Sequence, residues 1–92
     1  MDSTRIVVTV LGADRSGIVA AVATKLSEND ANILDISQTI LDGIFTMSMV
    51  VELNEHATSF DTLRQALLSL EKGLGVQVQV QREDVFKFMY RI

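Results

Sequence analysis

The stretch of sequence that decides the fold is residues 32–53, which read NILDISQTILDGIFTMSMVVEL. Apolar and β-branched residues fill both halves of this stretch, and Asp42-Gly43 stands between them. An Asp-Gly pair favours a two-residue type I′ turn, because both central positions of that turn need a positive φ. The pattern therefore predicts an antiparallel hairpin of two strands, residues 32–41 and 44–53.

In the segment before the hairpin, the spacing of apolar residues changes once, from that of a strand to that of a helix. Residues 5–11 alternate with the period of two that is typical of a strand. Apolar residues then recur at helical spacing from Ile18 onward. We predict a strand over residues 5–11 and a helix that Asp14 or Ser16 caps and that ends near Asn29.

In the segment after the hairpin, the spacing of apolar residues changes from that of a helix to that of a strand. Residues 60–74 carry large apolar residues at steps of three and four, behind a Ser59 cap. Gly73 and Gly75 supply the left-handed conformations that end this helix. Residues 76–81 alternate valine with glutamine, which predicts a strand with one buried face.

The order of elements is β-α-β-β-α-β, which predicts an α+β, ferredoxin-like fold. Its sheet has four antiparallel strands in the order 2-3-1-4, with two helices on one face, and strands 2 and 4 are its edges. An apolar edge strand is an aggregation risk in a monomer, so we expect a homodimer that pairs through residues 32–41. The residues predicted to face the helices are Ile6, Val8, Val10, Ile36, Met47, Met49, Val51, Val76, Val78 and Val80.

The C-terminal tail, residues 84–92, fits two patterns. Its aromatic residues alternate as in a strand, while other apolar residues fall at i, i+3, i+4 and i+7 as in a helix. We favour a short helix, because acidic residues stand at its start and basic residues near its end. Its apolar content indicates that it covers the open face of the sheet or a contact between subunits.

Composition narrows the class of protein. A chain of 92 residues makes one domain, residues 1–92, with a core over 4–83. At 48% hydrophobic and 22% charged residues it folds, and its lack of cysteine excludes disulfides and thiolate chemistry. The net charge of −4 argues against nucleic acid as a partner. The start lacks a basic leader and uncharged runs are far shorter than the ~20 residues of a membrane span, so we expect a cytoplasmic protein.

The loop of residues 12–16 carries the candidate binding site. It leaves the carboxyl end of a strand and enters a helix, whose free N–H groups and dipole favour an anion. Gly17 lets a ligand approach the backbone closely. Asp14 suits an ammonium group and the amides of Gly17 and Ile18 suit a carboxylate, which predicts a site for an amino acid zwitterion. The alternative is a capped helix with a tight entry turn and no ligand.

Residues 14–19, DRSGIV, followed thirteen residues later by Asn32-Ile33, resemble the motif of the ACT domain family. The family pattern is Asp/Asn-x-Pro-Gly-hydrophobic, then a helix, then Asn-Ile, and Ser16 stands here in place of the Pro. The order of elements agrees over residues 4 to about 83. In size and tail the chain is similar to stand-alone single-ACT proteins of prokaryotes that are related to the glycine cleavage repressor.

The resemblance implies a regulatory module, not an enzyme, which binds a small-molecule effector such as an amino acid between paired domains. We expect no cofactor and no metal, and a homodimer or a higher homo-oligomer without nucleic acid or membrane partners. Members that bind serine contact it through the positions of Asp14 and Asn32. The candidate site residues are Gly12, Ala13, Asp14, Arg15, Ser16, Gly17, Ile18, Asn32 and Ile33.

Three alternatives remain. Acylphosphatases share this length and element order and use an arginine in the first loop, a role for which Arg15 is the candidate; they also need an asparagine on strand 3, and residues 44–53 contain none. RNA-recognition domains share the topology, but of their stacking aromatics only Phe45 is present. A structural dimerisation module with an empty loop is the third. His56, a lone loop histidine, is interpreted as a solvated residue.

Overall fold

The computed structural model describes residues 3–13 and 17–89 and shows the predicted ferredoxin-like fold. Its strands form an antiparallel sheet in the order β2-β3-β1-β4. The strands in the described ranges are β1 (Ser3–Ala13), β2 (Ala31–Leu41), β3 (Ile44–Asn54) and β4 (Val76–Arg82). The helices there are α1 (Ile18–Glu28), α2 (Phe60–Leu68), α3 (Leu70–Leu74) and α4 (Glu83–Met89).

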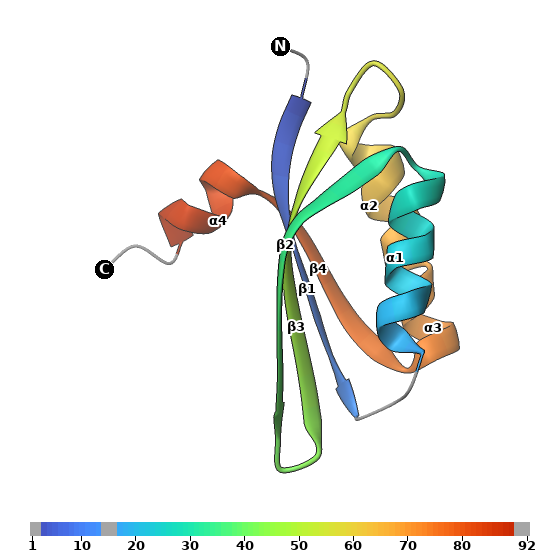
Figure 1. Cartoon of the computed structure of the whole chain (residues 1–92), viewed down its shortest axis with the longest axis vertical. Coiled ribbons are helices and arrows are strands. Elements are labelled where there is room, and N and C mark those ends of the chain that lie inside the picture. The colour runs from blue at the N-terminus through green and yellow to red at the C-terminus, as the bar shows by residue number, and fades with distance from the viewer. Residues whose placement is uncertain (1–2, 14–16, 90–92) are drawn as a thin grey trace.

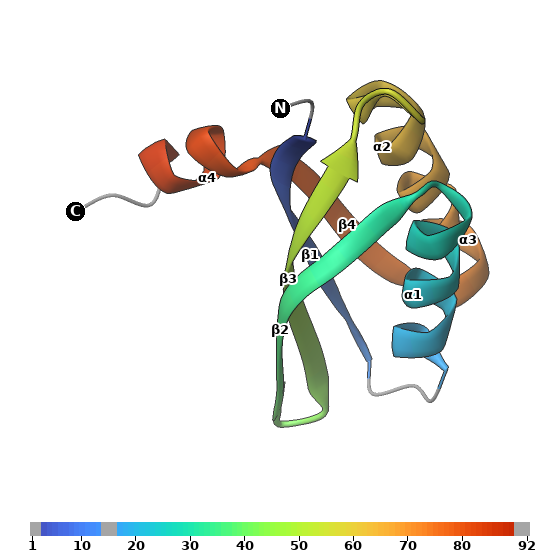
Figure 2. The same ribbon diagram turned by 45° about the horizontal axis from the view of Figure 1, so that its top comes forward.

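The molecule has one layer of helices on one layer of sheet. The helices α1, α2 and α3 cover one face, while α4 leaves the end of β4 on the other side and projects away from the sheet (Figures 1 and 2). The face that these three helices leave uncovered is called the open face below. The β2–β3 hairpin extends past the helix layer at the end of the molecule where β1 runs into α1 (Figure 1).

The core lies between the sheet and the three helices. Ile18, Val22 and Leu26 of α1 are buried there, as are Leu63 and Leu67 of α2. Nine of the ten residues predicted to face the helices are buried: Ile6, Val8, Val10, Met47, Met49, Val51, Val76, Val78 and Val80.

The prediction that Ile36 faces the helices is confirmed. Ile36 pairs with the buried Met49 and so lies on the helix-facing side of the sheet. Its side chain is nonetheless 38% exposed, because β2 is an edge strand and no neighbouring strand shields its outer flank.

A β-bulge at Leu34 sets which residues of β2 face the core. Ile33 pairs with Val51 and Asp35 pairs with Val50, so Leu34 is the extra residue on β2. Strict alternation from Ile33 would bring Asp35 to the core face. The bulge instead leaves Asp35 on the open face and returns Ile36 to the side of the helices.

The predicted hairpin turn is confirmed. Asp42 has a φ of 53° and Gly43 a φ of 81°, so both central residues take the left-handed conformations that a type I′ turn requires. The φ of Asp42 is tolerated because aspartate adopts this region more readily than most residues.

The prediction of one continuous helix over residues 60–74 is wrong, because the helix is interrupted at Ser69. The Ser69 hydroxyl donates to the carbonyl of Ala66 at 2.5 Å, a local bond that competes with regular helix geometry. The C-cap is Gly75, with a φ of 67°, as predicted. Gly73 does not have a positive φ and lies within α3, so its predicted role at the stop is wrong.

The start of α1 also differs from the prediction. The N-cap residue is Gly17, with a φ of 91° and a ψ of −10°, so neither Asp14 nor Ser16 occupies the N-cap position. The carbonyl of Gly17 accepts the first helical bond, from the N–H of Ala21 at 2.9 Å. The predicted end of the helix is confirmed, because Asn29 is its C-cap.

Candidate functional site

Gly12, near the end of β1, is explained by packing. It pairs with Phe45 on one side and with Val76 on the other. A Cβ atom on Gly12 would lie 2.7 Å from Cγ1 of Val76, which is closer than real Cβ atoms come to a neighbour. The close approach of β4 to β1 therefore requires glycine here, and this requirement involves no ligand.

Gly17 has a different environment. No atom lies within 4 Å of the position that a Cβ atom would take, so the space beside it is open. Its φ of 91° belongs to the region that L-residues rarely adopt. The glycine thus turns the chain into α1 and leaves the backbone at the helix start open to an approaching molecule.

Ile18 and the residues before Gly17 complete this part of the predicted site. The Ile18 side chain is buried in the core, so only its backbone amide is available to a ligand. The N–H groups of the first turn of a helix have no carbonyl partner within the helix, and the macrodipole adds positive potential there. Asp14, Arg15 and Ser16 lie outside the described residues.

A shallow hollow of about 430 Å³ adjoins the end of β1. Its volume falls within the roughly 300–1,000 Å³ of small-molecule sites. The residues of the described ranges that line it are uncharged: Leu11, Gly12, Ala13, Gly43, Ile44, Gly75, Val76 and Gln77. Gly12 and Ala13 therefore lie in a surface that accepts an apolar group.

Asn32 and Ile33 are not brought to this end of the molecule. They lie at the start of β2, where Asn32 is exposed and pairs with Glu52. The 11 residues of α1, about 16 Å of helix, separate them from Gly17 (Figure 1). Within one chain, the two halves of the predicted site lie at opposite ends of α1.

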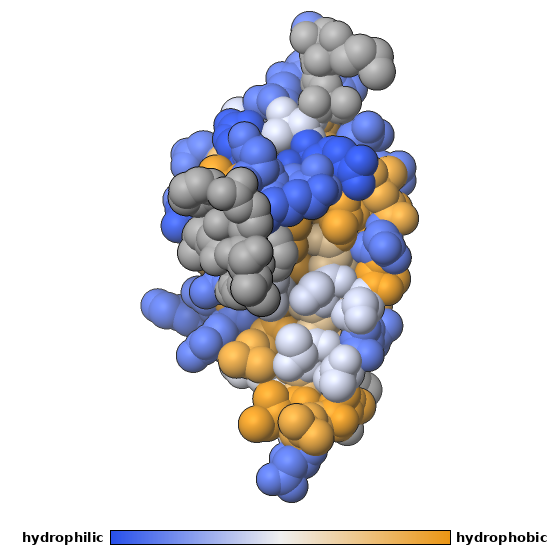
Figure 3. Space-filling view, turned by 90° about the vertical axis from the view of Figure 1, so that its left-hand side faces the viewer, coloured by the Kyte–Doolittle hydropathy of each residue, from blue (hydrophilic) through white to orange (hydrophobic). Residues whose placement is uncertain are grey.

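The edge of β2 and its hairpin expose a set of large apolar side chains. Leu41 is 74% exposed and Ile40 is 56% exposed, although both belong to an 11-residue strand. On the open face, apolar surface gathers toward this hairpin end (Figure 3). The exposed apolar residues near this end are Leu11, Ile40, Leu41 and Ile44.

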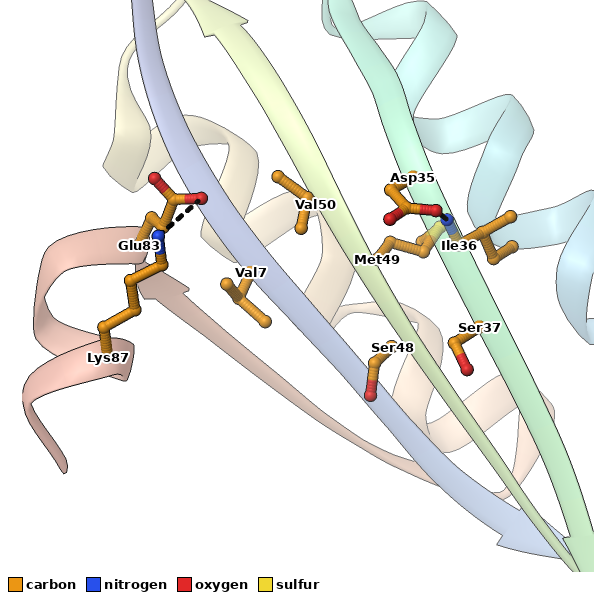
Figure 4. Close-up of a pocket in the computed structure, with 9 residues that line it drawn as sticks. All are labelled: Val7, Asp35, Ile36, Ser37, Ser48, Met49, Val50, Glu83 and Lys87. Carbon is orange, nitrogen blue, oxygen red and sulfur yellow. Dashed lines mark hydrogen bonds and ion pairs between the residues drawn. The ribbon is translucent and has the colours of Figure 1, made fainter. Parts of the chain in front are cut away.

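A second cavity, on the open face, was not predicted from the sequence. It measures about 240 Å³ and lies between α4 and β2 (Figure 4). We call it the open-face groove. Val7 and Val50 lie between the charged pair Glu83 and Lys87 on one side and Asp35 on the other. The groove is lined by Val7, Asp35, Ile36, Ser37, Ser48, Met49, Val50, Glu83 and Lys87.

A signal for this groove was present in the sequence. Val7 and Val50 stand at positions whose neighbours face the core, so alternation places two valines on the face away from the helices. Of the buried residues in the described ranges, Val7 is the one that lies on this face. An apolar pair at such positions indicates that something covers them.

The structure weighs against two of the alternatives. The asparagine closest to the acylphosphatase requirement is Asn54, the last residue of β3, but it pairs with Ser3, at the other end of β1 from Ala13. Its side chain accepts the N–H of His56 at 3.0 Å and so forms part of a turn. Phe45 is buried toward the helices, so it does not offer a stacking surface on the open face.

In residues 3–13 and 17–89, no three His, Cys, Asp or Glu side chains converge in a way that would hold a metal ion. None of the helices there has the length and apolar content needed to cross a membrane.

Comparison of the sequence with known families and proteins gives a consistent answer. A family model for the ACT domain matches residues 4–81. A UPF0237 protein of Methanocaldococcus jannaschii is 53% identical over 88 residues, which cover 96% of this chain and 98% of that protein. A UPF0237 protein of Methanopyrus kandleri is 52% identical over 89 residues, which cover 97% and 99% of the two chains.

Comparison with solved structures agrees. An ACT domain protein from Streptococcus pneumoniae superimposes with a TM-score of 0.79 at 41% identity, covering 95% of this chain and 98% of that one. A putative glycine cleavage system transcriptional repressor gives a TM-score of 0.78 at 21% identity, covering 87% of this chain and 46% of that one. At that identity the second likeness concerns the fold alone.

Proposed function

Because the chain belongs to the ACT domain family, we propose that it is a non-enzymatic regulatory module that binds an amino acid, or a similar small zwitterion, at the loop between β1 and α1. The observation that carries the proposal is the geometry of Gly17. A left-handed glycine with open space beside it stands directly before the amides of a helix start. This arrangement gives an anionic group access to the backbone of α1.

In this proposal, different groups around the loop bind different parts of the ligand. The first-turn amides, Gly17 and Ile18 among them, bind its carboxylate, and the carboxylate of Asp14 binds its ammonium group. The hollow beside Gly12 and Ala13 takes the side chain. Leu11 and Ile44 at this hollow are 40% and 53% exposed, which favours an aliphatic side chain on the ligand.

A second copy completes the site in this proposal. If β2 pairs antiparallel with its own copy over its full length, Asn32 of the second copy comes to lie opposite Ile40. Ile40 is at the hairpin end, where Ala13 pairs with Ile44, and this is the end at which β1 leads into α1. The symmetric pairing thus brings Asn32 and Ile33 to the end of the molecule that holds the loop.

The composition of β2 supports this pairing. The strand has no proline and no lysine, and its exposed Leu34, Ile36 and Ile40 leave apolar surface along an unpaired edge. Its one charged residue, Asp35, would stand opposite Ser37 of the second copy, so the pairing opposes no like charges. We therefore propose a homodimer through β2, acting in the cytoplasm.

Thermal unfolding in the presence of each of the proteinogenic amino acids tests the proposal. We expect at least one, with an aliphatic side chain, to raise the Tm, because a ligand at 100 times its Kd adds about 2.7 kcal/mol of stability. Calorimetry on the ligand found in this way should show weaker binding to Asp14→Asn, because charge-assisted bonds are about twice as strong as neutral ones.

Asp61→Asn is the matched control. Asp61 is exposed in the first turn of α2 and belongs to neither half of the proposed site, so this change removes the same charge outside it. Equal affinity of Asp14→Asn and Asp61→Asn would place the ligand elsewhere. If no amino acid raises the Tm while the chain is a dimer, the structural dimerisation module is the correct alternative.

A further inference from the structure

We propose that the open face of the sheet binds the same face of a second copy of this chain, with α4 of each copy lying in the open-face groove of the other. This interface is distinct from the pairing of β2 edges and does not depend on amino acid binding.

The helix α4 forms a ridge that stands beside the groove. Glu83, its first residue, is held by Arg5 of β1 at 3.3 Å and lies 3.9 Å from Lys87. Both Glu83 and Lys87 line the groove, so α4 is one of its walls (Figure 4). The helix is thus fixed relative to the sheet at its start, while its far end projects beyond the sheet (Figure 2).

The ridge exposes a large apolar side chain, because Val85 of α4 is 46% exposed between the exposed Asp84 and Lys87. The floor of the groove offers the buried Val7 and the half-buried Val50, which are also apolar. Covering the groove with Val85 removes the exposed parts of Val85 and Val50 from water.

Ridge and groove lie side by side on one face, and this makes the face complementary to itself. A twofold axis between two such faces places the ridge of each copy over the groove of the other, as an isologous interface requires. The seven residues of α4 are about 10 Å long, which matches the distance between two sheets packed face to face.

The rest of the open face can be covered without burying a charge. Two rows of side chains cross the sheet at and beyond the groove, and neither contains a charged residue. Charged residues are depleted at the centre of protein interfaces. The first row is Gln79, Thr9, Ser48 and Ser37, and the next is Gln77, Leu11, Thr46 and Thr39.

The charges at the groove fit the same arrangement. Asp35 stands on the wall that β2 provides, and Lys87 lies on the ridge. The carboxylate of Asp35 accepts the N–H of Ile36 at 2.9 Å through one oxygen. In the twofold arrangement, Lys87 of one copy approaches Asp35 of the other, and this opposite pair is formed twice.

The two interfaces use different surfaces, so both can form in one assembly. Edge pairing through β2 extends the sheet, while open-face pairing stacks it, and together they give a tetramer with two kinds of twofold axis. A variant that disrupts one interface should therefore halve the solution mass and leave the other interface in place.

Light scattering on the full chain and on Val85→Glu is the decisive measurement. A carboxylate on the ridge would have to be buried without a partner, so we expect this variant to have half the mass of the wild type. Val85 is exposed and peripheral, so the far-ultraviolet circular dichroism should not change. Gln65→Glu, which adds the same charge to an exposed position of α2, should keep the full mass.

A pair of charge variants tests the register of the two faces. Lys87→Asp alone should also halve the mass, because it sets two carboxylates against each other, and combining it with Asp35→Asn, which removes one of them, should restore the full mass. An unchanged mass of both Val85→Glu and Lys87→Asp would overturn the proposal. So would a folded double variant whose mass is not restored. Neither result would alter the expected amino acid binding.

Discussion

The two glycines that flank the loop after β1 are present for unrelated reasons. Gly12 is required by the side chain of Val76, and Gly17 is required by its own backbone angle. The sequence motif singled out Gly17, beside which the structure leaves open space. It gave no indication of the role of Gly12, because Val76 lies far away along the chain.

Gly17→Ala should lower the free energy of unfolding by about 1 to 2 kcal/mol, because alanine at a φ of 91° is strained even though the space beside it is open. Gly73→Ala is the matched comparison. Gly73 also has open space around its Cβ position but lies within α3 at an ordinary φ, so alanine there should add about 0.5 to 1 kcal/mol. Urea denaturation measures both.

Gly17→Asn should fall between these two results, since asparagine tolerates left-handed angles better than alanine does. Because its side chain occupies the open space, it should also block the ligand identified for the wild type. A Gly17→Asn protein that folds and binds with unchanged affinity would contradict the placement of the ligand at this backbone.

Among the helices, α2 has the clearest side-chain cap. The hydroxyl of Ser59 accepts the N–H of Thr62 at 3.1 Å, as the sequence predicts. Ser59→Ala should therefore cost about 1 kcal/mol in urea denaturation. Ser69→Ala makes the same change at another exposed serine, whose hydroxyl only donates back to a carbonyl, and it should cost less. An equal loss from both would show that the cap is not the cause.

Removal of residues 84–92 tests what the C-terminal tail contributes to stability and to assembly. The deletion keeps Glu83 and its ion pair with Arg5 but uncovers Val7, the buried residue of the open face. We expect a lower urea midpoint, because burying a valine contributes about 1.5 to 3 kcal/mol. We also expect half the solution mass. A truncated chain with the midpoint and mass of the full chain would show that the tail is dispensable.

The regular elements followed from local patterns, and the irregular ones did not. The Asp-Gly turn, the alternation of β4 and the cap of α2 each depend on residues that are neighbours in sequence. The bulge at Leu34 depends on what the strand packs against, and the break at Ser69 comes from a hydroxyl that donates to the carbonyl of Ala66, a bond that the apolar spacing does not reveal. The spacing of Ile33 and Ile36, three residues apart within a strand, is the trace that the bulge leaves in the sequence.

For the whole molecule, the order of the elements was sufficient to predict the topology. Two right-handed strand-helix-strand units place both helices on one face, and the observed strand order agrees. The site was less predictable, because its two halves lie at opposite ends of α1. Asn32 and the loop come together only if two copies meet, and no pattern within one chain specifies that distance.

Ile40→Lys tests whether two copies of the chain pair through the edges of their β2 strands. A lysine within the paired β2 edges should prevent edge pairing, so light scattering should give half the wild-type mass. Amino acid binding should weaken as well, since Asn32 of the second copy would be lost from the site. Gln65→Lys, at an exposed position of α2, is the control. Full mass for Ile40→Lys would exclude β2 as the subunit contact.

The double variant Ile40→Lys with Val85→Glu should be a monomer if both interfaces exist. A dimer in this variant would show that one of the two contacts lies elsewhere on the surface.

The place of β1 in the middle of the sheet governs how the chain folds as it is made. β1 pairs with β3 on one side and with β4 on the other, and β4 ends at Arg82. At 5 to 20 residues per second, a ribosome needs roughly 3 to 14 s to proceed from the end of β1 to the end of β4. During that interval the β2–β3 hairpin forms early, whereas the amino-terminal strand stays half paired. Until its last strand is complete, a nascent chain of this protein therefore exposes one edge of β1, a strand that ends up in the interior of the sheet.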